Sequence, residues 1–122
     1  MASGRIVVVE DDKAIRALLV AILIDEGCTV DAAADGQTAI MRLQAGDAPD
    51  MILVDVHMPT MDGPAFLRAY LAGPGPHAPV VFTTASQMTV DEATAVGAAG
   101  LLPKPLTLDE LETLIRQCTG CN

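Results

Sequence analysis

A regular alternation of short aliphatic runs with longer stretches of helical periodicity restricts the fold of this chain more than any other feature. Five runs have the length and composition of strands, the second and the last being the weakest: residues 6–9, 29–33, 51–54, 80–83 and 101–102. Strands that alternate with helices form right-handed crossovers between parallel strands. The alternation therefore predicts an α/β fold, with a parallel sheet that is covered by helices on both faces.

Helices are predicted where apolar residues recur three and four positions apart. The expected helices run from a cap at Asp12 to a stop at Gly27, from about Gly36 to Ala45, from Pro64 onward, and from a capping box formed by Thr107 and Glu110. The residues expected to face the core are Ile15, Leu18, Leu19, Ile22, Leu23, Ala39, Ile40, Leu43, Phe66, Leu67, Tyr70, Leu71, Leu108, Leu111, Leu114 and Ile115. Segment 88–99 carries only a thin apolar stripe, so we expect its helix, near residues 90–96, to be short.

The expected sheet is doubly wound, with the strand order 2-1-3-4-5 and about five helices, in a three-layer sandwich of the flavodoxin type. Strands 1, 3 and 4 are continuously apolar and suit the middle of the sheet, whereas Asp31 in strand 2 suits an edge. In this order the loops after strands 1 and 3 open a crevice where ligands bind. The length predicts one domain over residues 1–122, with no output domain.

The overall charge argues against two classes of partner. A formal net charge of −9 would repel nucleic acid and anionic membranes, so we expect no direct contact with either. The longest apolar run, residues 17–24, is too short to cross a bilayer, and the amino terminus lacks the pattern of a signal peptide. These observations indicate a cytoplasmic protein with reduced thiols, in which the C-x-x-C of Cys118 and Cys121 has no redox or metal role.

Acidic residues follow two neighbouring strands of the expected sheet. Glu10 and Asp11 leave strand 1, and Asp55 leaves strand 3 at the same edge. Two unit charges about 4 Å apart near a protein surface repel by roughly 4 kcal/mol, so three carboxylates in one crevice require a cation. Ligation by oxygen alone suits Mg²⁺, with Mn²⁺ as a substitute, better than zinc. The carboxylates therefore predict a magnesium site.

A hydroxyl and an ammonium group follow the remaining strands at the same edge, namely Thr84 after strand 4 and Lys104 after strand 5. With Mg²⁺ and Lys104 neutralising the charge of a phosphoryl group, Asp55 would attack phosphorus in line. The product would be an acyl phosphate, which is energetic enough to bias a conformational equilibrium. This chemistry indicates a phosphorylation switch more than a metabolic enzyme.

Four segments carry a family resemblance in their residues and in their order. VVVEDD (7–12), VDVHMPTMDG (54–63), TTAS (83–86) and LLPKPL (101–106) are similar to the motifs of response-regulator receiver domains of two-component signalling, the CheY-like family. The resemblance covers essentially the whole chain. It implies that Asp55 is the phospho-acceptor, that Thr84 and Lys104 assist it, and that the domain is not an enzyme that acts on an external substrate.

The resemblance also implies a set of metal ligands. Asp11 would bind Mg²⁺ directly together with Asp55, Glu10 would act largely through a metal-bound water, and His57 would contribute its backbone carbonyl. The family holds the peptide bond between Lys104 and the following proline in the cis form, and the same is expected here.

The partners implied by the resemblance are a histidine kinase or a histidine phosphotransfer protein as donor, and an output domain or effector. The effector would bind the face formed by the fourth helix, the fifth strand and the fifth helix. The family often has an aromatic residue three positions before the lysine, where this chain has Leu101. We therefore expect Thr84 and segment 88–102 to change on phosphorylation without the swing of an aromatic ring.

Two other functions remain open on the sequence. A small aspartyl phosphatase of the haloacid-dehalogenase kind uses similar residues, but it requires D-x-D after its first strand, where this chain has Glu10, Asp11 and Asp12. The other alternative is an interaction domain whose binding ignores phosphorylation. Ordinary structural roles are expected for three residues: a helix cap for Asp12, a turn and helix start for Asp62, and a surface position for His77.

Overall fold

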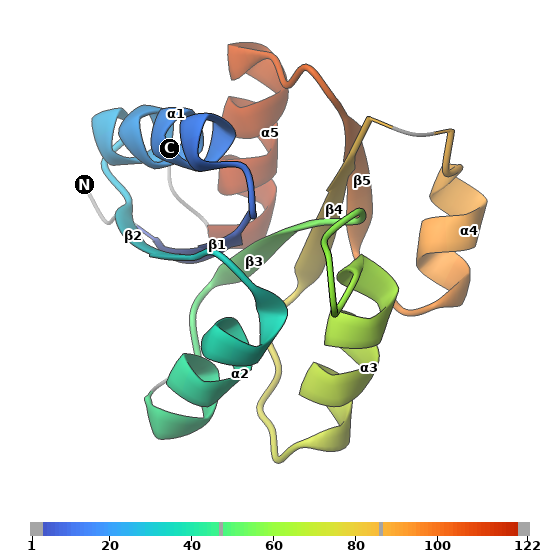
Figure 1. Ribbon diagram of the computed structural model, residues 1–122. Helices are drawn as coiled ribbons and strands as arrows, with labels where there is room; N and C mark the ends of the chain where they lie inside the picture. The colour runs from blue at the N-terminus through green and yellow to red at the C-terminus, as the bar shows by residue number, and fades with distance from the viewer. Residues whose placement is uncertain (1–3, 47, 86, 120–122) are drawn as a thin grey trace.

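The computed structural model describes residues 4–46, 48–85 and 87–119. Strands and helices alternate through this part of the chain: β1 (Arg5–Val9), α1 (Lys13–Asp25), β2 (Thr29–Ala33), α2 (Gly36–Ala45), β3 (Met51–Asp55), α3 (Gly63–Ala72), β4 (Val80–Thr84), α4 (Val90–Ala95), β5 (Gly100–Pro103) and α5 (Leu108–Thr119). All strand pairs are parallel, and the sheet has the order β2-β1-β3-β4-β5 (Figure 1). The predicted fold class and strand order are confirmed.

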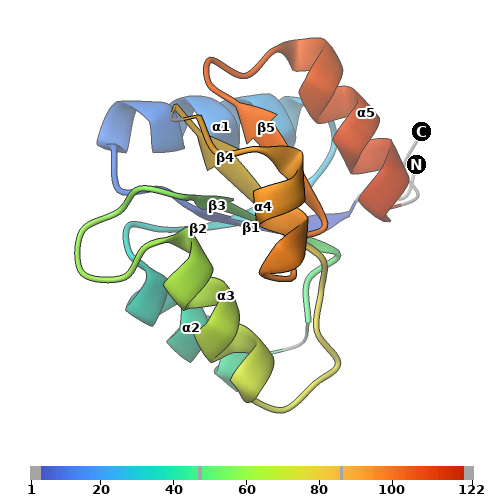
Figure 2. The same cartoon turned by 90° about the vertical axis from the view of Figure 1, so that its right-hand side faces the viewer.

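Helices cover both faces of the sheet, so the molecule has three layers. Figure 2 shows α1 and α5 on one side of the sheet and α2 and α3 on the other. Successive residues of a strand point to opposite faces. In β1, Val7 and Val9 belong to the hydrophobic cluster that includes residues of α2, α3 and α4, whereas Ile6 and Val8 belong to the cluster that includes residues of α1 and α5. The central strands are therefore buried on both faces, as their continuous apolar sequences predict.

Three leucines predicted to face the core are exposed instead. Leu18 in α1 is 61% exposed, Leu71 in α3 is 43% exposed and Leu108 in α5 is 51% exposed. Adjacent helical residues point about 100° apart, because a turn contains about 3.6 residues. A helix on a sheet buries a narrower arc than the one that we assigned, and each of these leucines lies outside it. The remaining predicted core positions are buried or half-buried.

The helix starts agree with the capping signals in the sequence. The carboxylate of Asp12 accepts a hydrogen bond from the N–H of Ile15 at 3.0 Å, and Asp62 caps α3 in the same way. Thr107 and Glu110 form the predicted capping box ahead of α5. Helix α4 has only 6 residues, so the expectation of a short helix in that segment is also confirmed.

The loop after α3 corrects the expectation for His77. This residue is half-buried, and its ring packs edge-on against Tyr70 with 4.9 Å between the ring centroids. The tyrosine hydroxyl accepts a hydrogen bond from the N–H of Ala78, and Nε2 of His77 lies 2.9 Å from the carbonyl oxygen of Gly73. The loop folds back over Tyr70 and packs the histidine against it, a contact that its Pro- and Gly-rich sequence does not reveal.

Two further expectations concern the cysteines near the carboxyl terminus and the absence of a membrane-spanning helix. The side chain of Cys118 and the whole of Cys121 lie outside the described residues, so their lack of a role stays a prediction. Over residues 4–46, 48–85 and 87–119, no helix combines the length and the apolar character needed to cross a membrane.

Gly63 lets helix α3 begin against the end of strand β3. Its N–H donates to the carbonyl oxygen of Val56 at 2.9 Å. A Cβ atom at this position would lie 2.9 Å from Cα of Val56 and 3.2 Å from the carbonyl oxygen of Asp55. Both neighbours are backbone atoms that cannot rotate away, so a side chain here would displace the helix from the strand.

We expect Gly63→Ala to lower the free energy of unfolding by about 1–3 kcal/mol, because the new methyl group meets backbone. Urea denaturation measures the change. Gly73→Ala is the matched control, since a Cβ there would lie 3.6 Å from its nearest neighbour and should stabilise the fold by about 0.4–1 kcal/mol. Equal effects of the two substitutions would contradict the close approach.

Candidate functional site

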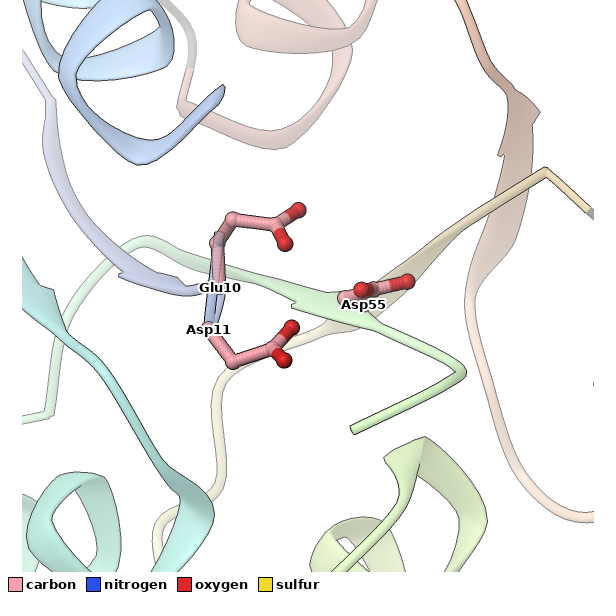
Figure 3. A group of neighbouring side chains, drawn as sticks. All are labelled: Glu10, Asp11 and Asp55. Atoms are coloured by element: carbon pink, nitrogen blue, oxygen red, sulfur yellow. The ribbon is translucent and has the colours of Figure 1, made fainter. Parts of the chain in front are cut away.

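Three carboxylates meet at the carboxyl ends of β1 and β3. These strands are adjacent and parallel, with Val9 paired to Val54, so the residues that follow them reach the same edge of the sheet. Figure 3 shows Glu10 and Asp11 extending from the loop after β1 toward Asp55 at the end of β3. One carboxylate oxygen from each residue lies within 4.8 Å of the others. The predicted convergence of the acids is confirmed.

The three acids differ in exposure and in the donors that they engage. Glu10 and Asp55 are buried, at 1% and 6% exposed, whereas Asp11 is exposed. Oε1 of Glu10 accepts from Nζ of Lys104 at 2.8 Å, and Oε2 accepts from the N–H of Asp12 at 3.2 Å. Both oxygens of Glu10 therefore have protein donors, which leaves Asp11 the better placed of the two to bind a cation directly.

Lys104 reaches across the sheet from the far edge. Its own N–H donates to the carbonyl oxygen of Thr84 at 2.7 Å, which extends the pairing of β4 and β5 beyond the strands. From there its ammonium group lies 2.8 Å from Oε1 of Glu10 and 3.3 Å from Oδ2 of Asp55. The sequence predicted that Lys104 would join the acids, but not its short contact with Glu10. The strand order and the length of a lysine side chain are the features from which the contact with Glu10 could have been predicted.

The ion pair and the burial change the pKa values of both partners. Burial lowers the pKa of Lys104, but the hydrogen bond and charge of Glu10, together with the charge of Asp55, outweigh it, so the pKa is raised. For Glu10, burial is the largest influence and exceeds the opposing effect of Lys104, so its pKa is also raised. The two pKa shifts have different causes. The acids stabilise the charged form of Lys104, whereas the charged form of Glu10 remains costly because its carboxylate is almost fully enclosed.

Thr84 and His57 flank the acceptor. Thr84 is 1% exposed and ends β4, where Asp55 pairs with the preceding residue, Thr83. The N–H of His57 donates to Oδ1 of Asp55 at 3.3 Å, and its side chain is exposed. The part assigned to the carbonyl of His57 stays a prediction. The peptide bond between Lys104 and Pro105 is cis, as expected.

The chemistry of the donors fits a hard divalent cation. The cluster consists of carboxylate oxygens, which Mg²⁺ and Mn²⁺ prefer, and contains neither thiolate nor imidazole. One ammonium group, that of Lys104, lies among the three acids and offsets only part of their charge. The exposed carboxylate of Asp11 leaves the cluster open toward solvent, where a hydrated ion can approach. Glu10, Asp11 and Asp55 are therefore suited to hold Mg²⁺.

The sheet order and the acidic cluster agree with the family resemblance of the sequence. A profile of the response regulator receiver domain matches residues 6–116 of this chain. That match spans most of the sequence. The chain belongs to the family of response regulator receiver domains.

Curated relatives and solved structures agree with this assignment. The response regulator MprA of Mycobacterium tuberculosis is 38% identical over 116 residues, and the transcriptional regulatory protein DltR of Streptococcus agalactiae is 34% identical over 114 residues. Each match covers more than nine tenths of this chain (93% and 92%) and 50% of the relative, so the chain spans about half the length of these relatives.

Two solved structures are similar over nearly the full length of both chains. The chemotaxis protein CheY4 of Vibrio cholerae is 30% identical with a TM-score of 0.83, covering 96% of this chain and 99% of its own. The receiver domain of the sensor histidine kinase PA1611 from Pseudomonas aeruginosa is 28% identical with a TM-score of 0.85, covering 98% and 99%. The latter structure has a magnesium ion coordinated in its active-site cleft.

We expect Lys104→Met to lower the free energy of unfolding by about 1.5–3 kcal/mol in metal-free buffer, because the enclosed carboxylate of Glu10 loses its charged donor. Urea denaturation in EDTA measures the loss. Lys13→Met is the matched control: this exposed lysine begins α1, and its removal should change the free energy by less than about 0.5 kcal/mol. Equal losses in the two variants would show that the ion pair contributes nothing.

The raised pKa of Glu10 predicts a pH dependence of stability. Below its unfolded value of 4.5 the group is protonated in both states, and as pH rises the folded state holds the proton longer than the unfolded chain does. The contribution of Glu10 to the unfolding free energy of the wild type therefore falls as pH rises from about 4.5 through its folded pKa. Glu10→Gln cannot titrate and should gain stability relative to the wild type over that range.

Denaturation of both proteins in EDTA, from about pH 4.5 to pH 7, tests this expectation. Asp109→Asn removes one negative charge from an exposed position in the first turn of α5 and serves as the control. If Glu10→Gln and the wild type give parallel curves, burial does not raise the pKa of Glu10.

Proposed function

We propose that residues 1–122 form one receiver domain that works as a phosphorylation switch in the cytoplasm. Asp55 would accept a phosphoryl group from a phosphohistidine of a histidine kinase or a histidine phosphotransfer protein. One observation carries this proposal: the carboxylate of Asp55 lies within 4.8 Å of those of Glu10 and Asp11, with the ammonium group of Lys104 at 3.3 Å. An acceptor carboxylate surrounded by metal-type ligands and a fixed cation is suited to in-line phosphoryl transfer.

In the proposed reaction, one carboxylate oxygen of Asp55 forms a bond to phosphorus on the side opposite the donor nitrogen. The P–N bond breaks, its electron pair returns to the donor imidazole, and an acyl phosphate remains on Asp55. Lys104, already within ion-pair distance of Asp55, would neutralise the phosphoryl oxygens, and the Thr84 hydroxyl would donate a hydrogen bond to one of them. Mg²⁺, when bound by Glu10, Asp11, Asp55 and the carbonyl of His57, would supply additional positive charge at the same place.

The proposed output is a change around β4, α4 and β5. Thr84 ends β4, and Leu101 in β5 is half-buried against the core beneath α4. Movement of Thr84 toward a phosphoryl group would therefore shift Leu101 and the short helix α4. Val90 and Leu108 are 60% and 51% exposed on α4 and α5, and they would contact an effector or output domain. We infer that the domain turns over no external substrate.

Incubation with acetyl phosphate and Mg²⁺ should add one phosphoryl group to the protein, because a small donor can reach Asp55 through the open side of the cluster. Intact mass spectrometry detects the product, and Asp55→Asn should remain unmodified. Asp62→Asn is the matched control: it makes the same chemical change seven positions along the chain, and asparagine still caps α3. This control should be phosphorylated like the wild type.

Three results would each contradict the proposal in a different way. No mass gain with any small-molecule donor would exclude the acceptor role of Asp55. Multiple-turnover release of phosphate from a monoester would favour the aspartyl phosphatase. A partner that binds equally with and without beryllofluoride would favour an interaction domain that ignores phosphorylation.

A further inference from the structure

We propose that Arg16 is a positioning residue for the metal and phosphoryl-acceptor site, acting through the backbone of the acidic loop between β1 and α1. Its Nη1 donates a hydrogen bond of 2.8 Å to the carbonyl oxygen of Glu10 and approaches the carbonyl oxygen of Asp11 at 3.5 Å. These are the main-chain oxygens of the two residues whose carboxylates enter the crevice. The inference rests on the proposed function, since it concerns the same site.

The position of Arg16 in its helix is unfavourable unless the side chain has such a contact. Arg16 is the fourth residue of α1, near the positive end of the helix dipole, where a cation is disfavoured. Apart from the capping carboxylate of Asp12, no acidic residue lies in the first turn of this helix. Within the described residues, Arg16 forms no salt bridge with a carboxylate. Its guanidinium turns back along the helix instead and binds the two carbonyls, which offers an electrostatic reason for a cation there.

Within the described residues, the contact of Arg16 restrains the peptide groups on either side of Asp11. At Glu10, the N–H donates to the carbonyl of Ala33 at 3.1 Å and the carboxylate is held by Lys104 and Asp12. Asp11 has an exposed side chain, and in the described part of the chain its carboxylate has no hydrogen-bond partner. Orientation of the Asp11 carboxylate therefore depends on the peptide planes on either side of it, and Arg16 binds both of their carbonyls.

Two consequences follow for a cation at Glu10, Asp11 and Asp55. A loop held in one conformation presents the Asp11 carboxylate at a lower entropic cost at the moment of binding. Removal of a group that orients a metal ligand typically weakens metal affinity by about 10- to 100-fold. Because Arg16 acts through the main chain and not on the carboxylate itself, we expect a value near the lower limit of that range.

The test measures Mn²⁺ affinity directly, by the electron paramagnetic resonance signal of the free ion, at constant ionic strength. Arg16→Met should weaken Mn²⁺ binding by about tenfold, and the Mg²⁺ concentration for half-maximal phosphorylation by acetyl phosphate should rise by a similar factor. Arg42→Met is the matched control, because Arg42 also donates to a backbone carbonyl, that of Ala32 in the edge strand β2, at 2.6 Å. It removes the same charge and a similar contact, and it should weaken binding by less than about twofold.

Arg16→Lys separates the geometry of the guanidinium from its charge, and it also replaces Arg16→Met if that variant fails to fold. Both contacts come from one guanidinium nitrogen, Nη1, at the end of the arginine side chain. The ammonium group of lysine keeps the charge but ends a shorter side chain and does not place a donor where Nη1 lies, so binding should still be weakened by about threefold or more. Affinity equal to wild type in Arg16→Lys, or equal weakening in Arg16→Met and Arg42→Met, would overturn the proposal. Phosphorylation of the wild type tests the proposed function independently, because it does not depend on the ratio between variants.

Discussion

The ammonium group of Lys104 makes the acidic crevice compatible with a folded protein. A carboxylate as enclosed as that of Glu10, at 1% exposed, is costly to charge unless a donor meets it. Lys104 lies 2.8 Å from Glu10 and 3.3 Å from Asp55, so one cation offsets part of the charge of two acids. Both contacts join residues far apart in the chain, and both cross the sheet, because β5 is separated from β1 by two strands and from β3 by one. The site therefore depends on the complete sheet. The two buried carboxylates at the carboxyl ends of β1 and β3 in turn depend on Lys104 to offset their charge.

The backbone around Asp11 is fixed more firmly than its side chain. Gly63 brings the start of α3 against the end of β3, and Arg16 holds the loop after β1 by its carbonyls. These two contacts belong to helices on opposite faces of the sheet, α3 and α1 (Figure 2). The exposed carboxylate of Asp11 is left between them with room for a hydrated cation.

The errors of the sequence-based predictions have a common physical origin. Leu18, Leu71 and Leu108 satisfy the helical spacing, but spacing gives only the direction of a side chain from its own axis and not the width of the surface beneath the helix. His77 lies in a segment with the composition of a solvated loop, yet this loop folds over Tyr70, and the ring of His77 packs against the tyrosine ring. Each case depends on where a neighbouring element lies. The periodicity of one segment contains no information about the position of a neighbouring element.

The sequence by itself determined the α/β class, the strand order, the edge position of β2 and the residues that gather at the carboxyl ends of the strands. These follow from local patterns, because alternating strands and helices allow few right-handed arrangements and parallel strands bring their ends to one edge. Only the tertiary structure decided that Lys104 pairs most closely with Glu10, that Glu10 is buried while Asp11 is exposed, and that Arg16 turns back to the acidic loop. Distances of this kind depend on side-chain reach and burial, which exist only once the layers have packed against one another.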